Sequence, residues 1–274
     1  MRTMIWLTMT TLVLRFTGLA AEAQAADAAN VQPQDAAIDL GGGVKLEMAL
    51  IRPGTFTMKG SMPNGADASH QVTLTKPYWI GKYELTQEQW FLVMGTNDAL
   101  KVKPAENPRT AMNGLGWADY QAFLEKLNPR VPGGGFRLPT EAEWEYACLA
   151  GSTNDPCCGP DLDSYAWYSA NNGHAIQPVG LKKPNAWGLY DTHGNVYELC
   201  SDFFGYFSKE SVTDPQGPET GLRGNRVARG GGTYPFATIH HSSGRSYERG
   251  IGHGEIGGSG PCALHGLRVA RDAK

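Results

Sequence analysis

Two carboxylates flank a short turn sequence in the second half of the chain. Asp191 and Glu198 lie on either side of Gly194, which permits a tight turn between them. Calcium binds about six to eight hard oxygens, and the carbonyls of such a turn can join two carboxylates in that role. The same sequence equally suits a turn in which Asp191 accepts hydrogen bonds from backbone amides. The residues leave both interpretations open.

A second group of residues with chemical potential lies in the C-terminal third. It comprises His240, His241, His253 and His265, with Glu248 and Glu255 between them. Imidazole titrates near neutral pH and also ligates transition metals. No spacing in this group matches a known metal motif, so a metal site, an acid–base site and a surface of polar loops all remain open.

Within this group we take Glu255 as the candidate catalytic acid–base residue, with His253 beside it. The glycines around them allow a ligand to approach the backbone closely. A carboxylate half-buried beside apolar groups has its pKa raised toward neutrality, which suits proton transfer. The alternative is that Glu255 is an exposed loop residue.

Five cysteines are the remaining reactive groups, and they are Cys148, Cys157, Cys158, Cys200 and Cys262. In an exported protein we expect them to form structural disulfides. Their connectivity cannot be deduced from the sequence. Because a bond between adjacent cysteines strains the peptide, we expect the neighbouring pair to bond elsewhere, or one of the two to stay unbonded.

The composition predicts the kind of scaffold that must position these groups. The chain has 274 residues, of which 35 are Gly and 17 are Pro, and 10% are aromatic. This glycine and proline content predicts short elements joined by many turns and excludes a helix bundle. The aromatic content excludes a disordered chain. A net charge of -3 gives no basic surface for nucleic acid.

The N-terminus has the pattern of a secretory signal peptide. Arg2 supplies a positive start, Met4–Leu14 is an apolar run too short to span a membrane, and Ala23–Ala25 gives a cleavage site. We therefore expect residues 1–25 to be removed. Residues 26–38 are expected to form a flexible lead-in to one domain over 39–272. No later run has membrane length, so we predict a periplasmic or secreted protein without a membrane span, and a monomer.

The strands expected in this domain are short. Residues 44–58 alternate apolar and polar side chains around Pro53-Gly54, which predicts a hairpin. Residues 71–80 predict a further strand. No internal repeat and no linker divides the chain after Asp39.

Capping boxes mark two of the three expected helices. Thr86 precedes Gln89 by three residues, and Thr140 precedes Glu143 in the same way, so each pair can satisfy the first amides of a helix. A third helix is expected over 116–127, where aromatic and apolar residues recur with helical spacing.

Several long segments, taken in order, resemble the family of the formylglycine-generating enzyme, also called sulfatase-modifying factor. They are Gly81–Thr86, Gly135–Ala147, Pro184–Asp191, His193–Glu198, Arg229–Tyr234, Gly244–Ser246 and Gly266–Val269. The resemblance covers nearly the whole mature chain. It implies one α+β domain of C-type-lectin-like type, rich in irregular loops.

The resemblance also implies ligands and a cleft. In this family a structural calcium lies at the His193–Glu198 motif, and by position its ligands would be the side chains of Asp191 and Glu198 and the carbonyls of Gly194 and Val196. Asp191 stands where the human-type motif has Asn, and it keeps an oxygen ligand. The family's cleft lies in the C-terminal region, which supports Glu255 and His253 as pocket residues.

The cysteines separate this chain from the copper-dependent members of the family. Those members carry two cysteines shortly after the stretch that corresponds to Arg229–Tyr234, and thiolates suit copper(I). Here residues 235–245 contain no Cys, and Cys262 stands alone beyond them. Standard formylglycine generation is therefore not expected. The ergothioneine-type iron chemistry of other members is not expected either, because it needs an additional helical domain.

Two classes of function follow. The first is an exported oxidoreductase that tailors or matures a peptide or natural product, with siderophore-maturing members of the family as the model and the redox metal unassigned. The second is a non-catalytic, lectin-like binding module or an accessory factor for another enzyme. Fold alone does not decide between them.

Overall fold

The computed structural model describes residues 34–60, 67–95, 104–153, 161–232, 246–248 and 264–273. By its internal contacts the chain divides into Met1–Gln32 and Pro33–Lys274, and every described residue belongs to the second unit. Among the described residues, no helix has both the length and the apolar character needed to cross a membrane. The expected signal peptide lies outside the described residues.

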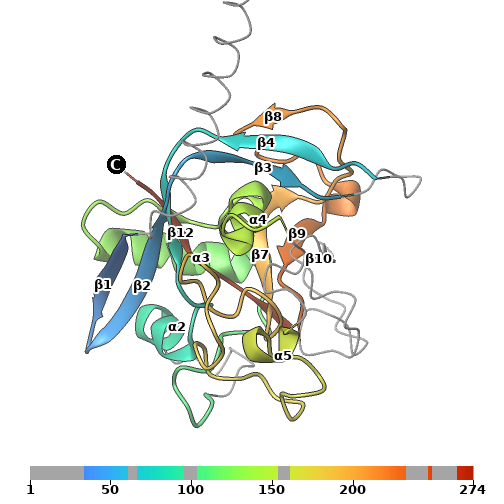
Figure 1. The fold of residues 1–274 in the computed structure, drawn as a ribbon. Coiled ribbons are helices and arrows are strands. Elements are labelled where there is room, and N and C mark those ends of the chain that lie inside the picture. Colours follow the sequence, from blue (N-terminus) through green and yellow to red (C-terminus); the bar gives the residue numbers. More distant parts are fainter. Residues whose placement is uncertain are drawn as a thin grey trace, which may run out of the picture. The chain divides into compact units, whose positions relative to one another are not determined.

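The described domain combines three β-sheets with short helices (Figure 1). The first sheet has the order β1 (Asp35–Gly41), β2 (Val44–Ile51), β5 (Tyr78–Gly81), β12 (Ala270–Asp272), β6 (Phe136–Arg137). The second has the order β10 (Ser246–Glu248), β9 (Arg226–Arg229), β7 (Tyr197–Phe203), β11 (His265–Gly266). The third has the order β3 (Gly54–Met58), β4 (His70–Leu74), β8 (Val212–Thr213). The helices are α2 (Gln87–Met94), α3 (Trp117–Leu127), α4 (Glu141–Leu149) and α5 (Leu162–Tyr165), with 3-10 turns at Asn128–Arg130 and Leu222–Gly224.

Helix α2 begins at the predicted capping box. The Thr86 hydroxyl accepts from the Gln89 amide at 3.3 Å, and the Gln89 side chain accepts from the Thr86 amide at 2.9 Å. The Gln89 side-chain amide also donates to the Lys45 carbonyl at 2.7 Å, which ties the start of α2 to β2. The box therefore both starts the helix and places it on the first sheet.

Helix α4 begins in the same way, and its box is also confirmed. The Thr140 hydroxyl accepts from the Glu143 amide at 3.1 Å, and the Glu143 carboxylate accepts from the Thr140 amide at 2.8 Å. Arg137 pairs with the same carboxylate at 2.7 Å. Helix α4 contacts β3 of the third sheet and β7 and β9 of the second, so it joins two sheets (Figure 1).

The predicted hairpin over 44–58 is wrong. Strand β2 pairs with β1 and β5, whereas β3 pairs with β4 in a different sheet. Pro53, which has no amide hydrogen, lies where the chain passes from one sheet to the other. The stretch 71–80 is likewise divided, because β4 and β5 belong to different sheets.

The predicted lead-in over 26–38 extends too far. Strand β1 begins at Asp35 and pairs with β2 through a turn of glycines, with Ile38 opposite Leu46. Ile38 and Leu40 also pack against the largest apolar cluster. These two side chains supply the apolar burial that orders the segment, so the domain starts before residue 39.

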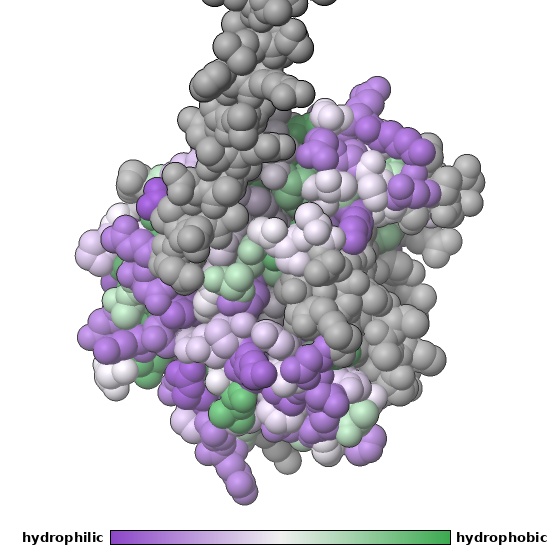
Figure 2. Space-filling view, in the orientation of Figure 1, coloured by the Kyte–Doolittle hydropathy of each residue, from purple (hydrophilic) through white to green (hydrophobic). Residues whose placement is uncertain are grey.

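The core has two main parts, one on either side of the first sheet. In the larger part, side chains of β2 and β6 meet those of α2 and α3, and Trp90 stacks on Phe123 with ring centres 5.4 Å apart. In the other, β2 and β5 meet β3, β4 and α4. On the described part of the face in Figure 2, hydrophilic residues prevail and the apolar ones are scattered.

Candidate functional site

The sequence from Asp191 to Glu198 forms a buried turn that leads into β7. Gly194 has φ 84°, and a Cβ there would lie 2.1 Å from the Trp167 carbonyl oxygen, so only glycine fits. The amide of Gly194 donates to the Gly230 carbonyl at 2.7 Å, and that of Asn195 donates to the Trp167 carbonyl at 2.8 Å. Close backbone contacts thus fix the turn and the side chains on it.

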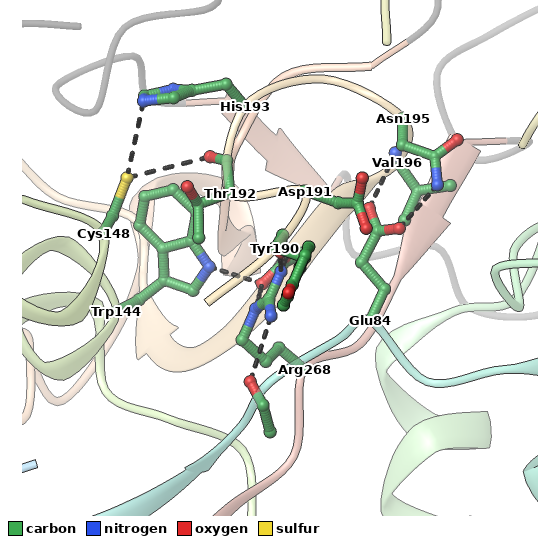
Figure 3. A network of polar contacts seen from close by, with 12 residues as sticks. Glu84, Trp144, Cys148, Tyr190, Asp191, Thr192, His193, Asn195, Val196 and Arg268 are labelled. Carbon is green, nitrogen blue, oxygen red and sulfur yellow. Dashed lines mark hydrogen bonds and ion pairs between the residues drawn. The ribbon is translucent and has the colours of Figure 1, made fainter. Parts of the chain in front are cut away.

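Glu198 forms a buried ion pair with Arg268. The guanidinium donates to the two carboxylate oxygens at 2.7 and 2.8 Å, and both side chains are 0% exposed. The Trp144 indole donates to the same carboxylate at 2.5 Å (Figure 3). Arg268 also donates to the carbonyls of Gly81 and Tyr190. Arg268 is thus held in a fully buried ion pair.

A third carboxylate, Glu84, was not predicted from the sequence as a site residue. It accepts from the Asn195 side chain at 2.6 Å and from the Val196 amide at 3.1 Å, so it holds the turn from the opposite side. Glu84 lies just before the Thr86 capping box, in a segment of buried strand and loop. A charged residue in such a segment is the signal that could have found it.

Asp191 lies beside Glu84, and their carboxylates point toward one another (Figure 3). One oxygen of Asp191 accepts from the Gly180 amide at 2.7 Å, while the other is buried without a hydrogen-bond partner. Burial raises the pKa of Asp191 to about 6, against the opposing effect of the Gly180 amide. Burial, and then the charges of Asp191 and Glu198, raise the pKa of Glu84 well above its usual value.

These bonds bear on the calcium site implied by the family resemblance. The buried second oxygen of Asp191 could accept a cation, but Arg268 engages both oxygens of Glu198. In the described ranges, no group of three or more His, Cys, Asp or Glu residues is arranged to hold a metal ion. With both oxygens of Glu198 engaged by Arg268, the donor set as it stands does not provide all four ligands. The hydrogen bond of Asp191 goes to the Gly180 amide, which lies outside the turn, so the alternative of a turn capped by Asp191 also stays open. Calcium binding at Asp191, Gly194, Val196 and Glu198 stays a prediction.

Cys148 and Cys200 are buried thiols rather than halves of a disulfide, contrary to expectation. Both belong to one apolar cluster with Trp144 and Val227, where their burial is explained by packing. The Cys148 sulfur lies 3.9 Å from the Nε2 atom of His193. Burial raises the pKa of Cys200 well above its usual value, so this thiol stays protonated. Cys157, Cys158 and Cys262 lie outside the described residues.

The predicted catalytic residues Glu255 and His253 also lie outside the described residues, as do His240, His241 and Arg245. His265 is described, and it is 0% exposed beside the ring of Tyr197. Burial lowers the pKa of His265 to about 4, which keeps its ring neutral at pH 7. It is therefore a core residue of β11.

Comparison with known proteins identifies the family. A model of the sulfatase-modifying factor enzyme 1-like domain matches residues 44–273. The chain belongs to this family. Among its relatives, a protein of Paenibacillus barcinonensis named chaperone protein LppX is 30% identical over 82% of this chain and 89% of its own length. The formylglycine-generating enzyme of Streptomyces coelicolor is 38% identical over 43% of this chain and 40% of its own length.

Solved structures confirm the sulfatase-modifying factor fold expected from the sequence. Treponema denticola variable protein 1 is 28% identical, with a TM-score of 0.73 over 88% of this chain and 100% of that protein. PvdO from Pseudomonas aeruginosa is 24% identical, with a TM-score of 0.69 over 89% of this chain and 100% of PvdO. The chain is a single α+β domain of this fold.

Proposed function

We propose that this protein is an exported accessory factor that binds another exported protein or peptide during its maturation. It does so without the copper–thiolate chemistry of the formylglycine-generating enzymes. The observation that carries the proposal is the absence of a cysteine pair after Arg229–Tyr234: residues 235–245 contain no Cys. The chain therefore lacks, at this position, the pair of soft thiolate ligands that suits copper(I), and we infer that it acts by binding a partner rather than by this chemistry.

The two described thiols support this proposal. Cys148 and Cys200 lie in the apolar cluster between α4 and β7, where water and a peptide cannot reach them. A buried thiol in apolar surroundings is a poor nucleophile, because the thiolate form is disfavoured. Neither residue therefore substitutes for the missing pair.

The lengths of the matched regions also favour an accessory role. The relative named as a chaperone matches across 89% of its length, whereas the Streptomyces formylglycine-generating enzyme matches across 40% of its length. The chain thus shares most of its domain with a protein whose name describes assistance to another protein.

A tailoring enzyme is the second candidate, because relatives in the family are named formylglycine-generating enzymes. In this alternative Glu255 is the acid–base group, with His253 beside it, and the substrate is a peptide or a natural product of siderophore type. Substituting the catalytic base would then lower product formation by about 100-fold or more.

The test is deletion of the gene in the native host, followed by quantitative proteomics of exported proteins and their activities. We expect one or a few exported proteins to lose abundance or activity. Complementation with wild type and with Glu255→Gln should restore them equally. If Glu255→Gln is exported at normal levels but fails to restore the product, the accessory proposal is wrong and the tailoring enzyme takes its place.

A second experiment addresses the chemistry. The purified mature protein is incubated with a sulfatase-type cysteine peptide, copper(I) and oxygen, and the peptide is analysed by mass spectrometry. We expect unchanged peptide. Formation of the aldehyde would overturn the proposal.

A further inference from the structure

A cavity of about 260 Å³ lies between β4, the start of α4 and the loop that follows β7. Its walls are mainly apolar and include Met58, Phe207, Val212 and Pro218. Its polar lining consists of Asp202, Glu141, His70, Tyr206, Ser208 and Gln216. It is separate from the turn at Asp191–Glu198, and no step of the proposed function uses it. An apolar pocket with a few polar groups is the usual form of a small-molecule site.

Among the described residues, Asp202 is a charged group of this pocket that has no cationic partner. It lies on β7 and is 3% exposed. One of its oxygens accepts from the Glu141 amide at 2.8 Å and from the Ser201 hydroxyl at 3.0 Å. Both donors are neutral, and in the described part of the chain no Lys or Arg forms an ion pair with Asp202. Arg229, the nearby cation, pairs instead with Glu141 and Glu145 at 2.8 and 2.7 Å.

The surroundings of Asp202 destabilise the ionised form of its side chain. Burial, and then the charge of Glu141, raise the pKa of Asp202 to about 7, and Glu143 adds to the effect. A buried carboxylate with no cationic partner gains most from a ligand that brings one.

His70 is a second polar residue that lines the pocket. It is 8% exposed, and its ring lies edge-on to Phe207 with centres 5.0 Å apart. Its Nδ1 atom lies 3.0 Å from the Ala68 carbonyl. Since a carbonyl can only accept, Nδ1 carries the proton, and in the neutral ring Nε2 is an acceptor. No Lys or Arg lines this cavity among the described residues.

We propose that this pocket binds a small apolar compound that carries an ammonium group, with Asp202 as its counter-ion. An ammonium has three donors and no acceptor, which matches a wall that offers acceptors and no cation. The apolar walls suit an aromatic or aliphatic body. An anion is disfavoured because Asp202 and Glu141 would repel it. The inference stands independently of the accessory function, since it concerns a different part of the domain.

The test is calorimetric titration of the mature protein with three probes of one shape. They are 2-phenylethylamine, 2-phenylethanol and phenylacetate, which are cationic, neutral and anionic at pH 8. We expect the amine to bind at least about tenfold more tightly than the alcohol, because a hydrogen bond to a charged group is worth about that factor. Phenylacetate should bind most weakly. Equal binding of the amine and the alcohol, or no binding of the amine, would overturn the proposal.

Variants identify the groups responsible. Asp202→Asn keeps an oxygen for the Glu141 amide and should abolish the preference for the amine over the alcohol. Glu210→Gln, an exposed acid on the chain that leads to β8, is the matched control and should leave the preference unchanged. Val212→Phe fills the cavity without altering its charge and should weaken the amine and the alcohol alike. If Val212→Phe binds the amine as wild type does, the site lies elsewhere and the proposal is wrong.

The pH dependence gives an independent check. Because burial raises the pKa of Asp202 to about 7, we expect the affinity for 2-phenylethylamine to rise between pH 5.5 and 8. His70 and Glu141 line the same pocket, so the rise is assigned to Asp202 only if Asp202→Asn, which leaves both in place, removes it. Affinity for 2-phenylethanol should change little. An affinity for the amine that falls over this range would contradict the role of Asp202.

Discussion

Arg268 is the residue on which the buried polar network of this domain depends. Its guanidinium donates to both oxygens of Glu198 and to the carbonyls of Gly81 and Tyr190, so one side chain joins three segments that are distant in sequence. The fork geometry of arginine makes this possible, and lysine could not reproduce it. Removing one partner of a buried pair leaves the other charge without compensation.

We therefore expect Arg268→Met to lower the free energy of unfolding by about 3 to 5 kcal/mol. Urea denaturation of the purified mature protein measures the effect. Arg52→Met is the matched control, since Arg52 is exposed, and it should change stability by less than about 0.5 kcal/mol. Similar losses in both variants would show that the ion pair contributes little.

The titration of Asp191 predicts that the free energy of unfolding depends on pH. Because burial raises the pKa of Asp191 to about 6, the folded state holds this proton more tightly than the unfolded state does. Its contribution to stability is therefore present at low pH and is lost as the pH rises from about 4 to about 6. Asp191→Asn removes this titration, so the variant should gain stability relative to wild type above pH 6. Denaturation curves at pH 4, 6 and 8 test it, and a constant difference across the three would contradict the assignment.

The calcium prediction has a direct test at the same residue. The calcium prediction requires that a chelator lower the melting temperature of the protein, whereas the pairing of Arg268 with both oxygens of Glu198 predicts no change. A bound ion at 100 times its dissociation constant would stabilise the fold by about 2.7 kcal/mol, which a melting curve resolves. A chelator-dependent fall that Asp191→Ala removes would restore the calcium site.

At the scale of elements, α4 connects the capping box at its start with the buried network around Glu198. Its first turn carries the Thr140–Glu143 box, and Glu143 pairs with Arg137 before the helix contacts β3 and β7. Trp144, the next residue of the helix, donates to Glu198. The start of α4 thus sets the position of Trp144, a hydrogen-bond donor of the buried network.

Loss of the cap should be measurable. We expect Thr140→Ala to cost about 1 kcal/mol, because the Glu143 amide loses its acceptor. Thr153→Ala, in the exposed coil after α4, is the control and should be nearly neutral. Thermal denaturation compares the two, and equal melting temperatures would show that water replaces the cap without cost.

The starts of these helices could be predicted because each depends on residues close in sequence. The order of the strands in the sheets could not be predicted. A capping box needs only residues three apart, so Thr86 and Thr140 could be recognised from the sequence alone. Strand β2 has buried residues on both faces and finds its partners far along the chain, which alternation around Pro53 cannot reveal. Glu84 was missed for the same reason, since the groups that it binds follow more than a hundred residues later.

At the scale of the whole molecule, export remains a prediction from the sequence. We expect the protein isolated from the extracytoplasmic fraction of its host to begin near Ala26, because Ala23–Ala25 is a cleavage pattern. Intact-mass and N-terminal peptide analysis measure this directly. An exported chain that still begins at Met1 would contradict the signal peptide. The ordered start of β1 at Asp35 leaves only a short segment between the cut and the fold.

The place of β12 in the first sheet affects how this protein can be made. β12 lies between β5 and β6, so a strand formed by residues 270–272 occupies an interior position of the sheet. The sheet cannot close until these residues have left the ribosome, and contacts between distant parts of a chain form slowly. We therefore expect the first sheet to stay incomplete until synthesis ends, which is compatible with the export predicted from the sequence.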